Sequence, residues 1–109
     1  MKIAFTAIAK DWDSKIDSRF GRASNILIFD DSNNNLSAID NLQNSEIAHG
    51  AGPKTAKVLI DNNVDILIIS NELGEKADSL IKKHSINTFK VSEKLTVREA
   101  YEAFKKINK

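Results

Sequence analysis

Three polar segments of the sequence hold the residue types that could do chemistry. They are Asp-Ser-x-Ile-Asp-x-Arg-Phe-Gly-Arg-Ala at 13–23, His-Gly-Ala-Gly at 49–52 and Ser-Asn-x-x-Gly at 70–74. The first segment supplies two guanidinium groups, Arg19 and Arg22. The second and third lead into segments that we expect to be helices, and the free N–H groups at a helix N-terminus favour anions. Together these segments predict a site for an anionic ligand.

His49 is the residue of these segments best suited to bind a metal, because a neutral imidazole is a competent ligand. The chain contains no Cys, which excludes disulfides, thiolate catalysis and Cys-ligated zinc or iron–sulfur sites. An anionic group that carries a metal would therefore rest on His49, backbone N–H groups and the arginines. The alternative is that His49 is a loop histidine without a ligand, and that Gly50 and Gly52 only permit a tight loop.

Hydrophobic patterning indicates the elements that position these segments. Apolar runs predict strands, and apolar residues at helical spacing predict helices. The expected strands are 3–8, 26–29, 36–42, 64–69 and 86–91. The expected helices run from Pro53 through Asn63, from Leu73 to Lys83, and onward from Thr96. Pro53 suits the first position of its helix, and Thr96 with Glu99 forms a capping box.

This order predicts a mixed five-stranded sheet with a hairpin near its N-terminus and three helices on its faces. If the first strand runs up, the loops 9–24, 43–52, 70–74 and 92–95 all lie at the carboxyl ends of up-running strands. Ligands bind at that edge of open α/β sheets. We therefore expect the three polar segments to converge there.

Two residues of the first segment also suggest structural roles. Arg19 and Arg22 could pair with Asp13 and Asp17 and so hold the long loop in place. Phe20 is expected to anchor that loop in the core. These roles do not exclude contact with a ligand.

Composition limits the possible functions. The chain has 109 residues, 41% of them hydrophobic and 28% charged, which suits a single globular domain over residues 1–109. The formal net charge is +1, so no strong field attracts nucleic acid or an acidic membrane. No stretch approaches the roughly 20 apolar residues of a membrane helix. We expect a cytoplasmic protein that is a monomer or a weak homodimer.

Four motifs in this order resemble the dinitrogenase iron-molybdenum cofactor biosynthesis family. They are the patterns at 13–23 and 49–52, Gly74 with Ala77, and Thr96-Val97-x-Glu99-Ala100, and they span nearly the whole chain. The family includes NifX-like proteins and the carboxy-terminal part of NifB-like proteins. The resemblance implies a three-layer α/β/α architecture of the ribonuclease H-like kind, in agreement with the expected order of elements.

The resemblance also implies a function without catalysis. Such a protein binds or carries an anionic iron–sulfur or molybdenum-containing cluster, or its precursor, at the loops 9–24, 43–52 and 70–74. Its partners would be proteins that donate or accept the cluster. The candidate binding residues are Arg19, Phe20, Gly21, Arg22, His49, Gly50, Ala51, Gly52 and Gly74, with His49 as the metal ligand. Relatives often carry Gly where this chain has Ser70 or Asn71.

Two other functions stay open. The same fold without a cluster would serve as a protein-interaction module, and an exposed Trp12 would suit a lid or partner contact. A metal-dependent nuclease or phosphoryl-transfer enzyme would need clustered carboxylates or a Walker-type loop. The expected first strand carries no acid, and no Walker-type loop is present. Asp11, Asp13 and Asp17 lie in a loop, where they fit turns and salt bridges.

Overall fold

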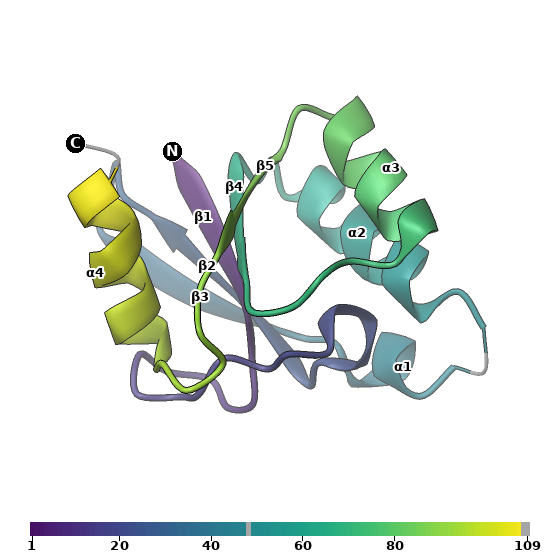
Figure 1. Cartoon of the computed structure of the whole chain (residues 1–109), viewed down its shortest axis with the longest axis horizontal. Coiled ribbons are helices and arrows are strands. Elements are labelled where there is room, and N and C mark those ends of the chain that lie inside the picture. The colour runs from purple at the N-terminus through teal and green to yellow at the C-terminus, as the bar shows by residue number, and fades with distance from the viewer. Residues whose placement is uncertain (48, 108–109) are drawn as a thin grey trace.

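Five strands form one mixed sheet at the centre of the molecule (Figure 1). This computed structural model describes residues 1–47 and 49–107. The strands are β1 (Lys2–Ala7), β2 (Asn25–Asp30), β3 (Asn35–Asp40), β4 (Ile66–Ile69) and β5 (Asn87–Lys90). Their order is β3-β2-β1-β4-β5; β1, β4 and β5 are parallel, and β2 is antiparallel to both β1 and β3. The strands β1, β3, β4 and β5 therefore end at one edge, as expected.

The long helices are α2 (Ala51–Asp61), α3 (Glu75–Lys83) and α4 (Val97–Ile107). The helices α2 and α3 cover one face of the sheet and α4 covers the other (Figure 1), which confirms the predicted three-layer α/β/α fold. Two short elements were not predicted, the four-residue helix α1 (Leu42–Ser45) and the 3₁₀ turn η1 (Phe20–Arg22). Leu42, which was expected to end the third strand, instead begins α1, and the other residues of both elements were expected to be loops. No helix among the described residues is long and apolar enough to cross a membrane.

Each face of the sheet has its own core, because successive side chains of a strand point to opposite faces. On β1, Ala4 faces α2 and α3, where it joins a cluster that includes Ile81. Its neighbour Phe5 faces α4 and joins a cluster that includes Phe104. Ala4 and Phe5 are both fully buried, at 0% exposure. This two-sided burial explains why the first strand is a continuous apolar run.

The start of α4 agrees with the sequence-based prediction, whereas the start of α2 differs from it. At α4 the Thr96 N–H donates to Glu99 Oε1 at 2.9 Å and the Glu99 N–H donates to Thr96 Oγ1 at 3.2 Å, which confirms the capping box. Pro53 was expected at the first position of its helix, and this is wrong by two residues, since α2 starts at Ala51. The first turn of a helix has no internal partners for its N–H groups, so the proline ring is tolerated there too.

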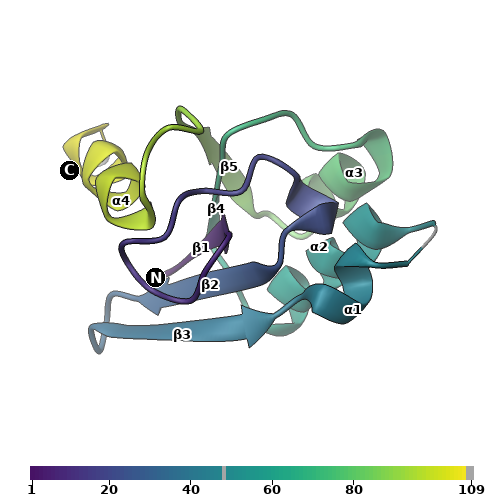
Figure 2. The same cartoon turned by 90° about the horizontal axis from the view of Figure 1, so that it is seen from below.

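The segment between β1 and β2 crosses the carboxyl edge from the α4 side to the α2 side (Figure 2). Ile16 is 2% exposed and belongs to the core beneath α4, whereas Phe20 is 8% exposed and belongs to the core beneath α2 and α3. The Trp12 carbonyl accepts from the Arg98 N–H at 2.9 Å, and the Ser14 carbonyl accepts from the α4 start at 2.8 Å. This segment is therefore fastened at both ends.

Trp12 is half-buried, so the expectation of an exposed tryptophan is wrong. Its ring centroid lies 5.0 Å from that of Phe29 and 5.7 Å from that of Tyr101. The Arg98 guanidinium carbon lies 5.7 Å from the centroid on the ring's face. Edge-to-face and cation–π contacts of this kind favour burial of the Trp12 ring over its exposure to water. Trp12 therefore covers one side of the core beneath α4.

Candidate functional site

Asp17 and Arg19 fix the first loop to the end of β1. The Asp17 N–H donates to the Thr6 carbonyl at 2.9 Å, and the Thr6 hydroxyl donates to the Asp17 carbonyl at 2.8 Å. The Asp17 side chain is 4% exposed, and its carboxylate accepts from Arg19 Nε at 3.1 Å and from Nη2 at 3.0 Å. This hydrogen bonding raises the pKa of the Arg19 guanidinium above its usual value. The expected pair is confirmed, and it neutralises part of the charge that Arg19 offers to an anion.

Arg22 joins the first loop to the second. Its Nη1 donates to the Ser45 carbonyl at 2.7 Å and to the Ile47 carbonyl at 2.5 Å. Asp13, which was expected to pair with an arginine of its own loop, instead lies 3.5 Å from Arg98 Nε. Because its carbonyl partners carry no net charge, Arg22 holds the second loop and still keeps its positive charge at this edge.

Gly21 lies directly against the first residues of α2. A Cβ on Gly21 would stand 2.6 Å from the Gly52 nitrogen and 2.9 Å from the Ala51 carbonyl carbon. Real Cβ atoms essentially never come that close to backbone, so the contact requires glycine. The adjacent Phe20 is buried as an anchor, which confirms its expected role. The structure thus brings together four predicted site residues, Phe20, Gly21, Ala51 and Gly52.

Two helix N-termini meet beside this contact. Helix α2 begins after Gly50, whose φ of 80° is left-handed, and α3 begins after Gly74. Within residues 1–47 and 49–107, no side chain caps either helix. A Cβ on Gly52 would lie 3.4 Å from the Ala77 Cβ, so the two helices approach closely at their starts. Both helices run away from the carboxyl edge of the sheet. Their uncapped N–H groups and partial positive charges therefore face the same region, which favours an anion.

Side-chain charges at this edge are mixed. An open depression of about 420 Å³ adjoins the ends of β1 and β5, and its charged lining residues are Lys15, Asp17, Arg19, Glu93 and Lys94. Three cations face two carboxylates there, and one carboxylate already has Arg19 as its partner. The first turn of α3 adds the carboxylates of Glu75 and Asp78. An anion held at this edge would thus depend on backbone N–H groups at least as much as on side-chain charge.

Ser70 was not among the predicted binding residues, yet its hydroxyl lies in an unusual environment. It follows β4 at the same edge, and its Oγ is buried without a hydrogen-bond partner in the described part of the chain. A buried hydroxyl without a partner costs free energy, so it calls for an explanation. A ligand with acceptor atoms would supply the partner. The sequence did hold a signal, because Ser70 is the first polar residue after the apolar run 66–69.

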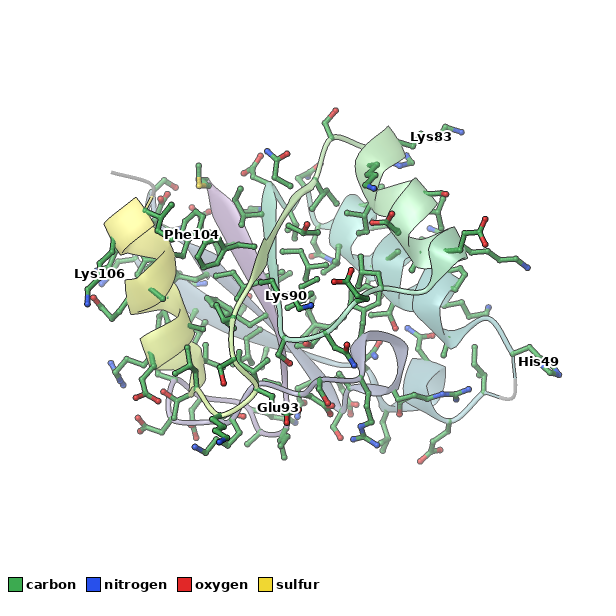
Figure 3. All side chains as sticks on the ribbon, in the orientation of Figure 1. His49, Lys83, Lys90, Glu93, Phe104 and Lys106 are labelled. Carbon is green, nitrogen blue, oxygen red and sulfur yellow. The ribbon has the colours of Figure 1, made fainter. Side chains whose placement is uncertain are left out.

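His49 lies apart from these groups. Its side chain is exposed and projects from the outer edge of the molecule, beyond the start of α2 (Figure 3). Within residues 1–47 and 49–107, no group of three or more His, Asp or Glu side chains could hold a metal ion. The role of His49 as a ligand stays a prediction.

The chain is similar to proteins of one family. A family model described as dinitrogenase iron-molybdenum cofactor matches residues 1–107. The apo form of the orange protein from Desulfovibrio gigas is 31% identical, with a TM-score of 0.90 over 96% of this chain and 87% of that one. A candidate NifB protein from Thermotoga is also 31% identical, with a TM-score of 0.83 over 96% and 87% of the two chains. No curated protein matches the sequence.

Proposed function

This chain belongs to the dinitrogenase iron-molybdenum cofactor family, and we propose that it binds an anionic metal–sulfur cluster or its precursor and carries it without catalysing a reaction. The family and the similarity to the orange protein support a cofactor-related binding or carrier role. The cargo is an iron–sulfur or molybdenum-containing cluster, and the partners are the proteins that donate and accept it. The proposed site is the edge formed by loops 9–24, 43–52 and 70–74.

The observation that carries this proposal is the pair of uncapped helix N-termini. Glycine is the N-cap residue of both helices, and no side chain in the described part of the chain bonds the N–H groups at either start. The close approach at Gly52 and Ala77 adds the two partial charges together. A hydrogen bond to a charged group contributes about 1.5–3 kcal/mol, and several such bonds suffice for useful affinity.

This chemistry suits carriage. Hydrogen bonds to cluster sulfurs are a recognised way in which a protein holds a cluster and tunes it. A cluster held by N–H groups and one imidazole is released without breaking any metal–thiolate bond. The unpartnered Ser70 hydroxyl offers one more donor to an acceptor sulfur or oxygen at the same edge.

The test uses anaerobic tetrathiomolybdate as the probe and compares two substitutions at Gly74. Gly74→Asp adds a capping carboxylate, whereas Gly74→Asn adds a neutral cap of the same shape. No atom lies within 4 Å of a Cβ at this position, so both variants should fold. A carboxylate about 8 Å from each unit of ligand charge repels it by about 2 kcal/mol at an effective dielectric of about 20. Retention of the probe, followed by visible absorption after desalting, should therefore fall at least about tenfold in Gly74→Asp and much less in Gly74→Asn.

The two histidines separate the role of His49 from nonspecific metal binding. His84 is the C-cap of α3, so it lies at the end of that helix opposite the proposed site and serves as the control. Weaker uptake in His49→Ala than in His84→Ala would support ligation by His49. Equal uptake would leave the helix N-termini as the site and remove His49 from it. No uptake by the unchanged protein would refute carriage and favour the interaction module.

A further inference from the structure

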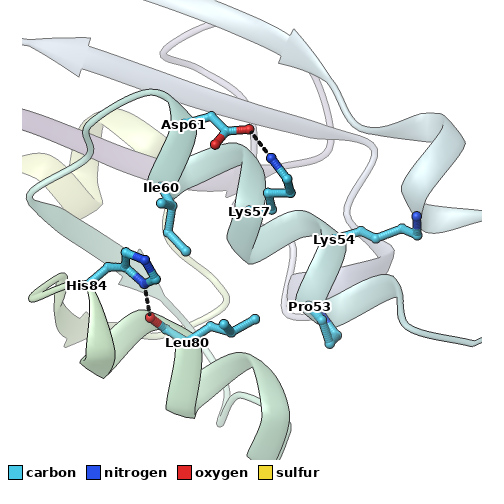
Figure 4. A pocket seen from close by; sticks show the side chains of 7 residues that line it. All are labelled: Pro53, Lys54, Lys57, Ile60, Asp61, Leu80 and His84. Carbon is cyan, nitrogen blue, oxygen red and sulfur yellow. Dashed lines mark hydrogen bonds and ion pairs between the residues drawn. The ribbon is translucent and has the colours of Figure 1, made fainter.

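An apolar groove lies between α2 and α3 on the face turned away from the sheet (Figure 4). Its volume is about 490 Å³, and its apolar lining consists of Pro53, Ile60 and Leu80. These three side chains are partly exposed, and Ile60 and Leu80 also pack against the core beneath α2 and α3. A second depression of about 320 Å³ shares Ile60 and His84 with the groove, so the hollow continues past the end of α3.

The groove is basic at the end lined by Pro53 and Lys54, whereas Asp61 and Asp65 lie toward its other end. Lys54, Lys57 and His84 flank it, and the Asp61 carboxylate on the same side already accepts from Lys57 Nζ at 2.8 Å. Helices α2 and α3 together carry five lysines against three carboxylates, although the whole chain has a formal charge of only +1. Exposed ion pairs such as Lys57 with Asp61 contribute little, so a partner carboxylate could replace Asp61 readily.

We propose that this groove docks an acidic amphipathic helix of a partner protein. Apolar side chains at helical spacing would fill the space over Pro53, Ile60 and Leu80, and flanking Asp or Glu residues would pair with Lys54 and Lys57. Amphipathic helices recognise grooves between helices in this way, with anchors at i, i+3 or i+4 and i+7. The proposal goes beyond cluster carriage and does not require a cluster.

A second copy of this chain is a poorer occupant for the groove. The same groove on another copy presents the same lysines, so a symmetric contact would bring like charges together. Helix α4 of another copy carries both signs of charge, with two lysines at its C-terminal end. The charge of the groove therefore favours an acidic partner over self-association.

The probe is a synthetic 18-residue amphipathic peptide with leucines along one stripe and glutamates beside them, and its twin has lysines in place of the glutamates. The cluster-free protein is labelled with nitrogen-15, and binding is followed by amide chemical shifts and peptide anisotropy. The glutamate peptide should bind saturably, at least tenfold more tightly than its twin. Its shift changes should gather on residues 53–61 and 80–86. Raised salt should weaken it, because paired surface charges are screened.

Three substitutions give the proposal its sharpest test. Leu80→Glu places a carboxylate in the groove, and Lys54→Glu reverses an exposed rim charge with little risk to folding. Both should weaken the glutamate peptide at least fivefold. Ile107→Glu is the control, because Ile107 is a 71% exposed apolar residue on α4, on the other face of the sheet. The proposal would be overturned if neither peptide bound, if both bound equally, or if the shift changes lay outside α2 and α3. It would also be overturned if all three variants lost binding equally, or if the protein self-associated through this face.

Discussion

Replacing Gly21 by alanine should destabilise the protein through one identifiable contact. The new Cβ would stand 2.6 Å from the Gly52 nitrogen, whereas ordinary contacts begin near 3.4 Å. The turn η1 or the start of α2 must therefore move by about 0.8 Å, which is the difference between those two distances. Neither can move freely, since Phe20 is buried in the core and Arg22 is bonded to two carbonyls of the second loop.

The expected magnitude combines two opposing terms. Overpacking of this kind costs about 1–3 kcal/mol, and the lower entropy of the unfolded alanine chain returns about 0.4–1 kcal/mol. The midpoints of these two ranges give a net loss of about 1.3 kcal/mol for Gly21→Ala. At about 4 °C per kcal/mol for a domain of this size, Tm should fall by roughly 5 °C.

The assay is urea unfolding, with Gly74→Ala as the matched control. A Cβ at Gly74 meets nothing within 4 Å. A poorer cap and a less flexible unfolded chain act in opposite directions there, so we expect a change within about 0.5 kcal/mol. Gly21→Ala should lower the midpoint without changing the slope. If Gly21→Ala proved as stable as Gly74→Ala, the close contact between η1 and α2 would not exist, and the reasoning would fail.

Two further predictions concern residues outside the site. Asn41 is 1% exposed and its amide donates to the Ala23 carbonyl at 2.9 Å and to Thr55 Oγ1 at 3.1 Å, so Asn41→Ala should cost about 2–3 kcal/mol in urea unfolding. Additive losses in a double-mutant cycle with Thr55→Val would contradict a coupled network. The bond from the Thr96 N–H lowers the pKa of Glu99, so its charged form stabilises the fold above the ordinary glutamate pKa and loses that effect as the pH falls through the lowered value. The Tm of Glu99→Gln should accordingly lie below that of the unchanged protein at pH 7 and approach it near pH 3, and a constant gap would refute this account.

The direction of the chain through the sheet could be predicted from sequence because each signal was local. Continuous apolar runs indicated the buried strands, and the Asp30–Asn35 turn indicated the antiparallel pair of β2 and β3. Once β2 ran down, the loops after β1, β3 and β4 had to lie at one edge, as they do. The capping box at the start of α4 was equally local, since Thr96 and Glu99 are three residues apart.

The contacts between loops could not be predicted, because they join segments that are distant in sequence. Arg22 bonds backbone carbonyls 23 and 25 residues away, and a carbonyl carries no side-chain signal. Trp12 is a single aromatic residue in a polar stretch, so no periodicity shows which way it points. Its burial depends on Phe29 and Tyr101, which meet it only after α4 has packed on the sheet. The contact between Gly21 and α2 could be predicted only if the first residue of α2 were known, and Pro53 suggested a start two residues too late.

The geometry also decides how an anion would be held at the proposed site. His49 is exposed, so binding must immobilise its side chain, which costs about 0.5–1.5 kcal/mol. The N–H groups that begin α2 and α3 are already fixed by their helices, so an anion bound there would not incur that cost. The carboxylate introduced by Gly74→Asp would repel an anion from these fixed N–H groups, whereas His49→Ala removes a side chain that must first be immobilised. We therefore expect Gly74→Asp to weaken cluster uptake more than His49→Ala, and the reverse order would show that the imidazole, not the helix N-termini, holds the cargo.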